Sequence, residues 1–292
     1  VTGVQTCALP IFPSRTAPHH HRGRDPHPRL MPFDWQSATD AEVDLQYSPS
    51  QFSKRQLDEY LHEYHRLSAP WAGKNLVIPG APLLVYIHGG YWQRLSAADS
   101  LFNADDAQRL GFSLHATEYT LAPHATVERI VQECIDDVSS VLDRAQAPRV
   151  VVAGCSAGAH LATMVAMSPR LTGRVGMVVL LSGIYDLRPV VRINDNDALG
   201  LDTERAAALS PALLPHAGYP PNAVVAVGRH EPGEFIRQSA EYAVQLRDNG
   251  VRTAHAVIDD RDHFDLPYDL LRTGTFVGDH VVTYLRTGEW AG

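Results

Sequence analysis

The chain has 292 residues, an apolar content of 45% and a formal charge of −8, so it is long and apolar enough to bury one sizeable core. The acidic balance argues against nucleic acid or an anionic membrane surface as a partner, and no apolar run is long enough to span a bilayer. The three cysteines show no Cys-x-x-Cys spacing. They predict neither a disulfide framework nor a zinc site and fit a reducing, cytoplasmic setting.

The first thirty residues differ in composition from the rest. Residues 13–29 are rich in Pro, His and Arg and show no periodicity, and residues 1–12 lack the basic region and cleavage site of a signal peptide. We therefore expect residues 1–30 to be a disordered or artefactual extension and residues 31–292 to form a single folded domain. The alternative for the extension is a metal-binding tract formed by His19, His20, His21 and His27.

From residue 33 onward, apolar strands alternate with helical patterns. Helical spacing over 51–67 predicts an N-terminal cap spanning about 33–70. Unbroken apolar runs separated by amphipathic helices predict a mostly parallel central sheet with helices on both faces. The predicted strands are 82–88, 112–118, 149–153, 175–181, 223–227 and 251–258, and the predicted helices are 97–110, 127–144, 234–248 and 275–285. Residues 186–217 fit this alternation poorly and indicate an inserted lid.

One motif carries the strongest chemical signal, and it directly follows the strand over 149–153. A strand that turns through Gly-x-Ser-x-Gly into a helix is typical of the nucleophile elbow of α/β-hydrolases, which projects the serine Oγ above the sheet. We expect both glycines to be required because a Cβ would collide with neighbouring backbone. The motif, Gly154-Cys155-Ser156-Ala157-Gly158, therefore predicts an α/β-hydrolase fold with Ser156 as nucleophile. A tight turn with an idle serine is the alternative.

A serine hydroxyl is a weak nucleophile unless a base accepts its proton and a carboxylate orients that base. In this fold the acid and then the histidine follow the serine in the chain, each after a later strand. His263 comes directly after the last predicted strand, whereas His160, His255 and His280 lie inside predicted elements. We therefore expect His263 to be the base, the alternative being a surface loop histidine.

The acid should follow the strand over 223–227, where the loop contains Glu231 and Glu234. Glu234 falls in the first turn of the next helix, where a carboxylate complements the helix dipole without any catalytic duty. Glu231 lies nearer the end of the strand. It is the better candidate to orient the base, and Glu234 stays open as the alternative.

Acyl transfer also needs hydrogen-bond donors for the oxyanion that develops on the substrate. Paired glycines let the main chain approach a substrate oxygen and present N–H groups without obstruction. Such a pair, Gly89 and Gly90, follows the strand over 82–88. We expect their N–H groups to form an oxyanion hole with that of Ala157, the alternative being a plain glycine turn.

Together these motifs resemble the kynurenine formamidase (arylformamidase) family of α/β-hydrolases, close to the hormone-sensitive-lipase-like esterases, over about residues 42–285. The resemblance implies Ser156, His263 and Glu231 as the catalytic triad and no cofactor. Eukaryotic members carry aspartate at the position of Glu231, and Cys155 replaces a more usual histidine. The resemblance to this family is based on the segments Tyr47–Ser50, Tyr86–Trp92, Glu118–Pro123, Ser156–Leu161, Leu181–Leu187, Glu234–Ser239 and Asp262–Phe264.

The resemblance implies hydrolysis of N-formylkynurenine to kynurenine and formate, in tryptophan breakdown, through a formyl-enzyme. Tyr91, Trp92 and Tyr185 could line an aromatic pocket for the leaving group, although ordinary core packing is the alternative for each. A promiscuous carboxylesterase acting on short-chain esters shares the fold and triad and is the nearest rival. We expect a small-molecule substrate and no metal, nucleic-acid or membrane partner, with a homodimer left open.

Overall fold

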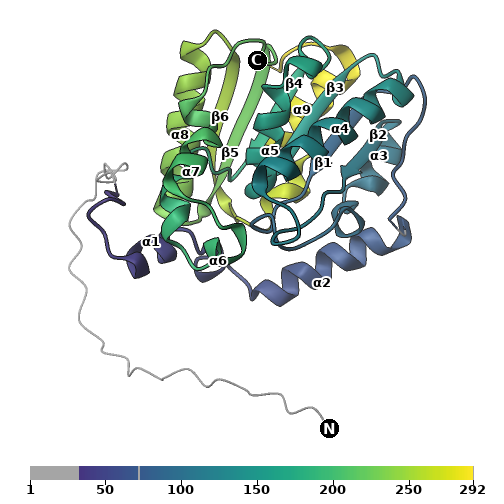
Figure 1. The fold of residues 1–292 in the computed structure, drawn as a ribbon. Coiled ribbons are helices and arrows are strands. Elements are labelled where there is room, and N and C mark those ends of the chain that lie inside the picture. The colour runs from purple at the N-terminus through teal and green to yellow at the C-terminus, as the bar shows by residue number, and fades with distance from the viewer. Residues whose placement is uncertain (1–32, 72, 292) are drawn as a thin grey trace, which may run out of the picture. The chain divides into compact units, whose positions relative to one another are not determined.

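The computed structural model describes residues 33–71 and 73–291, so the prediction for residues 1–30 lies outside the described part of the chain. The described residues build one central sheet whose six strands all run parallel, in the order β2-β1-β3-β4-β5-β6 (Figure 1). The strands are β1 (Leu83–Ile87), β2 (Ser113–Thr117), β3 (Val150–Cys155), β4 (Met177–Leu181), β5 (Asn222–His230) and β6 (Arg252–Asp262). The predicted parallel sheet is confirmed.

Helices cover both faces of this sheet, because successive side chains of each buried strand point to opposite faces. In β1, Leu83, Val85 and Ile87 join one apolar core, and Leu84 and Tyr86 join the other. The first core is closed by α4 (Val127–Ala145), α5 (Ala157–Ala166) and α8 (Gly233–Asp248), and the second by α3 (Ala104–Leu110) and α9 (Phe276–Thr287). The parallel direction brings the carboxyl ends of all strands to one edge of the sheet.

The N-terminal segment contributes α1 (Asp40–Gln46) and α2 (Leu57–Ser68). The start of α2 differs from the prediction of a helix over 51–67, because Pro49–Gln51 forms a separate 3₁₀ turn. The hydroxyl of Ser53 then donates to the carbonyls of Ser50 and Arg55. Such local hydrogen bonds compete with a continuous helix, so α2 begins only after them.

Residues 186–217 form short helices between β4 and β5. These are η5 (Arg188–Arg192), α6 (Asn196–Leu199), α7 (Thr203–Ala208) and η6 (Pro211–Leu213). The insertion packs against the N-terminal segment, since Arg192 pairs with Asp40 at 2.7 Å and donates to the carbonyl of Ala38 at 2.6 Å. That this insertion acts as a lid stays a prediction.

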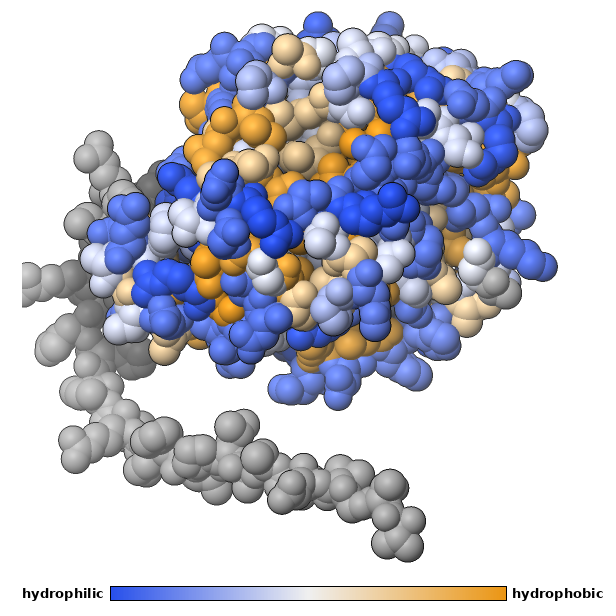
Figure 2. All heavy atoms as spheres, viewed as in Figure 1, coloured by the Kyte–Doolittle hydropathy of each residue, from blue (hydrophilic) through white to orange (hydrophobic). Residues whose placement is uncertain are grey.

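Polar and charged residues dominate the face of the molecule drawn in Figure 2, with apolar residues visible between them. Within residues 33–71 and 73–291, no helix is long and apolar enough to cross a membrane. In the same ranges, no group of three or more His, Cys, Asp or Glu side chains is arranged to hold a metal ion.

Candidate active site

Ser156 occupies a sharp turn between β3 and α5, with φ 59° and ψ −125°. A positive φ is costly for a residue with a side chain and is typical of functional sites. A Cβ built on Gly154 would lie 2.1 Å from the carbonyl oxygen of Gly158, and one on Gly158 would lie 2.1 Å from that of Ile87. The structure thus explains both glycines of the motif, because any side chain there would collide with backbone.

His263 and Glu231 form a buried hydrogen-bonded pair, with 2.8 Å between Nδ1 and Oε2. The other carboxylate oxygen, Oε1, accepts from the Ser182 hydroxyl at 2.6 Å and the Gly228 N–H at 2.7 Å. Because a carboxylate accepts, the imidazole carries its proton on Nδ1 and leaves Nε2 free to accept one. Ser182 directly follows β4, and no local pattern in the sequence indicates its contact with Glu231.

The second candidate acid, Glu234, lies in the first turn of α8 and is also buried. Arg237 donates to both of its carboxylate oxygens, from Nε at 2.7 Å and from Nη2 at 2.8 Å, and the Tyr47 hydroxyl donates to Oε2 at 3.4 Å. Glu234 therefore joins α8 to the N-terminal segment. The structure brings Glu231, and not Glu234, to His263.

The buried histidine of the elbow helix, His160, occupies a different environment. Its Nε2 hydrogen-bonds to the Leu209 carbonyl at 2.8 Å, and the Trp92 ring packs edge-on against it at 5.1 Å. Burial lowers the pKa of His160 to about 4, so this ring is neutral near pH 7. It fills the core between α5 and the insertion.

The loop that carries His263 is held on both sides by α2. The Tyr60 hydroxyl donates to the Asp262 carboxylate, and the Tyr64 hydroxyl donates to the Phe264 carbonyl. Tyr60 and Tyr64 are four residues apart and so face the same side of the helix. Their helical spacing is readable in the sequence, but their partners lie about 200 residues away and are not.

The predicted oxyanion loop begins directly after β1. A Cβ on Gly89 would lie 2.6 Å from the Cys155 carbonyl oxygen and 3.2 Å from the Ser156 Cβ, so only glycine allows this close approach. The Tyr119 hydroxyl donates to the carbonyls of His88 and Gly89 and anchors the loop. Gly89 and Gly90 therefore lie next to Ser156, and Ala157 opens α5 on the other side of the serine.

Ser156, His263, Gly89 and Gly90 all line one cavity of about 420 Å³. This volume is typical of pockets for small molecules. Most of the remaining wall is apolar or aromatic and comes from α2, β1 and the loops around them. It includes Pro49, Leu57, Leu61, Tyr64, Tyr86, Tyr91, Leu95 and Phe264.

Of the aromatic residues predicted to bind substrate, the structure brings Tyr91 to this cavity and not Trp92 or Tyr185. Tyr91 and Trp92 have φ of 52° and 57°, and this left-handed turn separates the two side chains. Tyr91 lines the cavity, and its hydroxyl donates to the Tyr47 carbonyl. Trp92 is fully buried and packs on His160.

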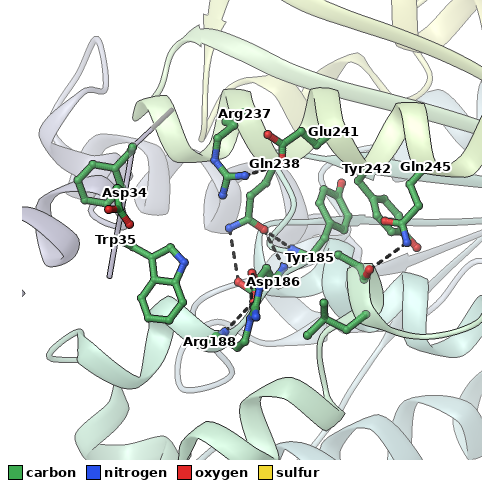
Figure 3. A pocket seen from close by; sticks show the side chains of 13 residues that line it. Asp34, Trp35, Tyr185, Asp186, Arg188, Arg237, Gln238, Glu241, Tyr242 and Gln245 are labelled. Atoms are coloured by element: carbon green, nitrogen blue, oxygen red, sulfur yellow. Dashed lines mark hydrogen bonds and ion pairs between the residues drawn. The ribbon is translucent and has the colours of Figure 1, made fainter. Parts of the chain in front are cut away.

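Tyr185 lies in the wall of a separate pocket of about 470 Å³ (Figure 3). Its ring stacks on Tyr242 of α8 at 4.1 Å. Gln238 lines this pocket and contacts a residue that lines the Ser156 cavity: its Oε1 accepts from the Tyr185 N–H at 2.7 Å, and its Nε2 donates to the hydroxyl of Tyr47 at 2.7 Å. Tyr185 lies between β4 and the insertion and packs on α8, a contact that the apolar pattern alone does not reveal.

The fold and the strained serine turn define an α/β-hydrolase, and a family model described as the alpha/beta hydrolase fold matches residues 84–264. A kynurenine formamidase of Danio rerio is 30% identical over 273 residues, which cover 80% of this chain and 92% of that protein. One of Salmo salar is 29% identical over 86% of this chain and 96% of its own length. The chain therefore belongs to the kynurenine formamidase family of α/β-hydrolases, and it is a hydrolase.

Solved structures support the same fold at lower identity. A Silicibacter protein described as a candidate thioesterase has a TM-score of 0.73 and 23% identity, with 83% of this chain and 99% of that chain covered. The carboxylesterase EstE1, cloned from a metagenomic library, has a TM-score of 0.64 and 19% identity, with coverages of 87% and 98%. At these identities the likeness concerns the fold alone.

Proposed function

We propose that Ser156, His263 and Glu231 form a catalytic triad and that the enzyme hydrolyses N-formylkynurenine to kynurenine and formate. The observation that carries the proposal is the buried hydrogen bond between Glu231 and His263, at the wall of the cavity that Ser156 also lines. The names of the relatives support the choice of substrate.

In the first half of the reaction, His263 Nε2 accepts the proton of Ser156 Oγ as that oxygen bonds to the formyl carbon. The N–H groups of Gly89, Gly90 and Ala157 stabilise the resulting oxyanion, each such donor contributing on the order of 3 kcal/mol to lowering the barrier. The C–N bond then breaks. His263 transfers its proton to the departing aniline nitrogen, kynurenine leaves, and a formyl ester remains on Ser156.

In the second half, a water molecule attacks the formyl ester while His263 accepts one of its protons. A second tetrahedral intermediate collapses, His263 returns its proton to Ser156 Oγ, and formic acid leaves and loses its remaining acidic proton to solvent to give formate. Throughout both halves, the Ser182 hydroxyl and the Gly228 N–H hold the Glu231 carboxylate that orients the imidazole. No step needs a cofactor.

The aromatic lining of the cavity also supports an aryl formamide. Tyr64, Tyr86 and Phe264 line the cavity and would pack against the aromatic leaving group.

A carboxylesterase acting on short-chain esters is the second candidate, because the largely apolar wall would also accept ester substrates. The deciding measurement is kcat/KM of the purified enzyme for N-formylkynurenine against 4-nitrophenyl acetate. We expect the formamide to be preferred, and a preference for the ester of about a hundredfold would overturn this proposal. Labelling of the wild type, but not of Ser156→Ala, by a serine-reactive phosphonate tests the nucleophile itself.

A further inference from the structure

The Ser156 cavity contains one ion pair. Among the described residues that line it, Arg94 and Asp195 are the ones that belong to the types Lys, Arg, Asp and Glu. Arg94 belongs to the segment after the oxyanion loop and Asp195 to the insertion between β4 and β5, with 2.9 Å between Nη1 and Oδ1. The side chains are 62% and 22% exposed, so they face solvent at the cavity and pair only weakly with each other.

Hydrogen bonds hold both residues close to the oxyanion loop. The Arg94 N–H donates to the Gly90 carbonyl at 3.0 Å, and a Cβ on Gly90 would lie 2.4 Å from the Arg94 carbonyl oxygen. The Gln93 side chain donates to the Asp195 carbonyl at 2.9 Å. The ion pair is thus held on the same short segment that carries two of the proposed oxyanion donors.

Both charged groups retain hydrogen-bonding capacity. A guanidinium has five N–H donors and a carboxylate about four acceptor sites. Within the described residues, Arg94 makes its side-chain hydrogen bond through Nη1, and Asp195 accepts through Oδ1, at 2.9 Å from Arg94 and 3.5 Å from Gln93. The Nε and Nη2 groups of Arg94 and the Oδ2 atom of Asp195 have no hydrogen-bond partner among residues 33–71 and 73–291, so they can bind a ligand.

The two charges have opposite signs, and this decides which ligand they fit. An anion alone would be attracted by Arg94 and repelled by Asp195, and a neutral ester would gain nothing from either. The amino-acid group of a zwitterion carries both complementary charges on one carbon. Its carboxylate can pair with the guanidinium and its ammonium with the carboxylate, while its aromatic ring stays against the apolar wall.

We propose that Arg94 and Asp195 bind the α-carboxylate and the α-ammonium of the substrate and thereby select an aryl formamide with an amino-acid end. This assignment rests on the proposed function. It gives the insertion a role in specificity through Asp195, whereas the triad residues come from the edge of the sheet.

The test compares N-formylkynurenine with 2-formamidoacetophenone, which has the same aryl formamide but no amino-acid end. We expect Arg94→Gln and Asp195→Asn to lower kcat/KM for N-formylkynurenine about 10- to 100-fold, mainly through KM, and to change the neutral formamide less than about twofold. Arg94→Lys should recover part of the loss, since it restores the charge without the fork of donors. The matched controls Arg170→Gln and Asp136→Asn remove an exposed ion pair elsewhere and should change neither substrate.

Equal losses on both formamides, or no loss on either, would overturn the assignment. A separate measurement, calorimetric binding of kynurenine against 2-aminoacetophenone, needs no turnover. If the wild type cleaves esters but no formamide, the proposed function fails. In that case, weaker binding of kynurenine to Arg94→Gln than to the wild type would still support a site for the amino-acid group at Arg94 and Asp195. Equal binding to the wild type and Arg94→Gln would exclude that site as well.

Discussion

The Ser156 cavity has two walls that are built in different ways. At the sheet edge, Gly154, Gly158 and Gly89 bring backbone segments so close that a Cβ would overlap a carbonyl oxygen. On the opposite side, α2 is attached to the His263 loop through the hydroxyls of Tyr60 and Tyr64. The first wall depends on the absence of side chains. The second, the α2 wall, depends on side chains, because Tyr60 and Tyr64 also pack on the rings of Phe264 and Phe102.

The largest effect is expected within the sheet-edge wall, at Glu231. In Glu231→Gln the amide can still accept from Ser182 and Gly228, but it then presents its NH₂ group to His263 Nδ1 and disfavours the required tautomer. We expect kcat to fall about 10³- to 10⁴-fold, with the melting temperature nearly unchanged. Steady-state kinetics and thermal unfolding measure the two quantities.

The matched variant is Glu234→Gln, which weakens the pair with Arg237. It should lower the free energy of unfolding by about 1–2 kcal/mol and leave kcat within a few-fold of wild type. The opposite pattern, with activity lost in Glu234→Gln and retained in Glu231→Gln, would exclude the proposed acid.

The second effect concerns stability. In Gly158→Ala the new Cβ would lie 2.1 Å from the Ile87 carbonyl oxygen and 2.6 Å from that of His88, so β1 and α5 must move apart. We expect the free energy of unfolding to fall by about 3 kcal/mol or more, measured by urea denaturation.

Gly111→Ala is the control for this change, because Gly111 has φ 73° and open space around its Cα. It should cost only about 1–2 kcal/mol, the cost of a left-handed alanine. Gly158 is not among the glycines with a positive φ, so a loss in Gly158→Ala no larger than that in Gly111→Ala would contradict the expected crowding at the elbow.

The same difference between the walls explains what the sequence could predict. The elbow and the succession of strands along the chain follow from local sterics and apolar runs, so the parallel sheet and the sequence positions of Ser156 and His263 are readable directly, whereas the strand order within the sheet is not. The split between Glu231 and Glu234 needed the hydrogen bonds of each carboxylate. The attachment of α2 and the burial of Trp92 depend on contacts between distant segments, which no local pattern encodes.

The smallest effect is expected in the α2 wall, at Tyr60. Burial raises the pKa of the Asp262 carboxyl, but hydrogen bonds from Tyr60, the Lys54 N–H and the Phe264 N–H outweigh it and hold the pKa below its ordinary 3.8. A depressed pKa adds stability above the unfolded-state value that is lost as the pH falls through the folded-state value. Tyr60→Phe should therefore lower the free energy of unfolding by about 1 kcal/mol at pH 7, and the difference should shrink in acid.

Because Asp262 directly precedes His263, the same variant should lower kcat about three- to tenfold, as expected for a contact worth roughly 1 kcal/mol. Tyr268→Phe is the matched control, since within the described residues the buried Tyr268 hydroxyl has no hydrogen-bond partner, and it should change neither quantity. If Tyr60→Phe loses stability at pH 7 and retains full kcat, α2 supports the fold without positioning His263. In that case only groups at the sheet edge, above all Glu231, would orient the His263 imidazole, and α2 would contribute to stability but not to catalysis.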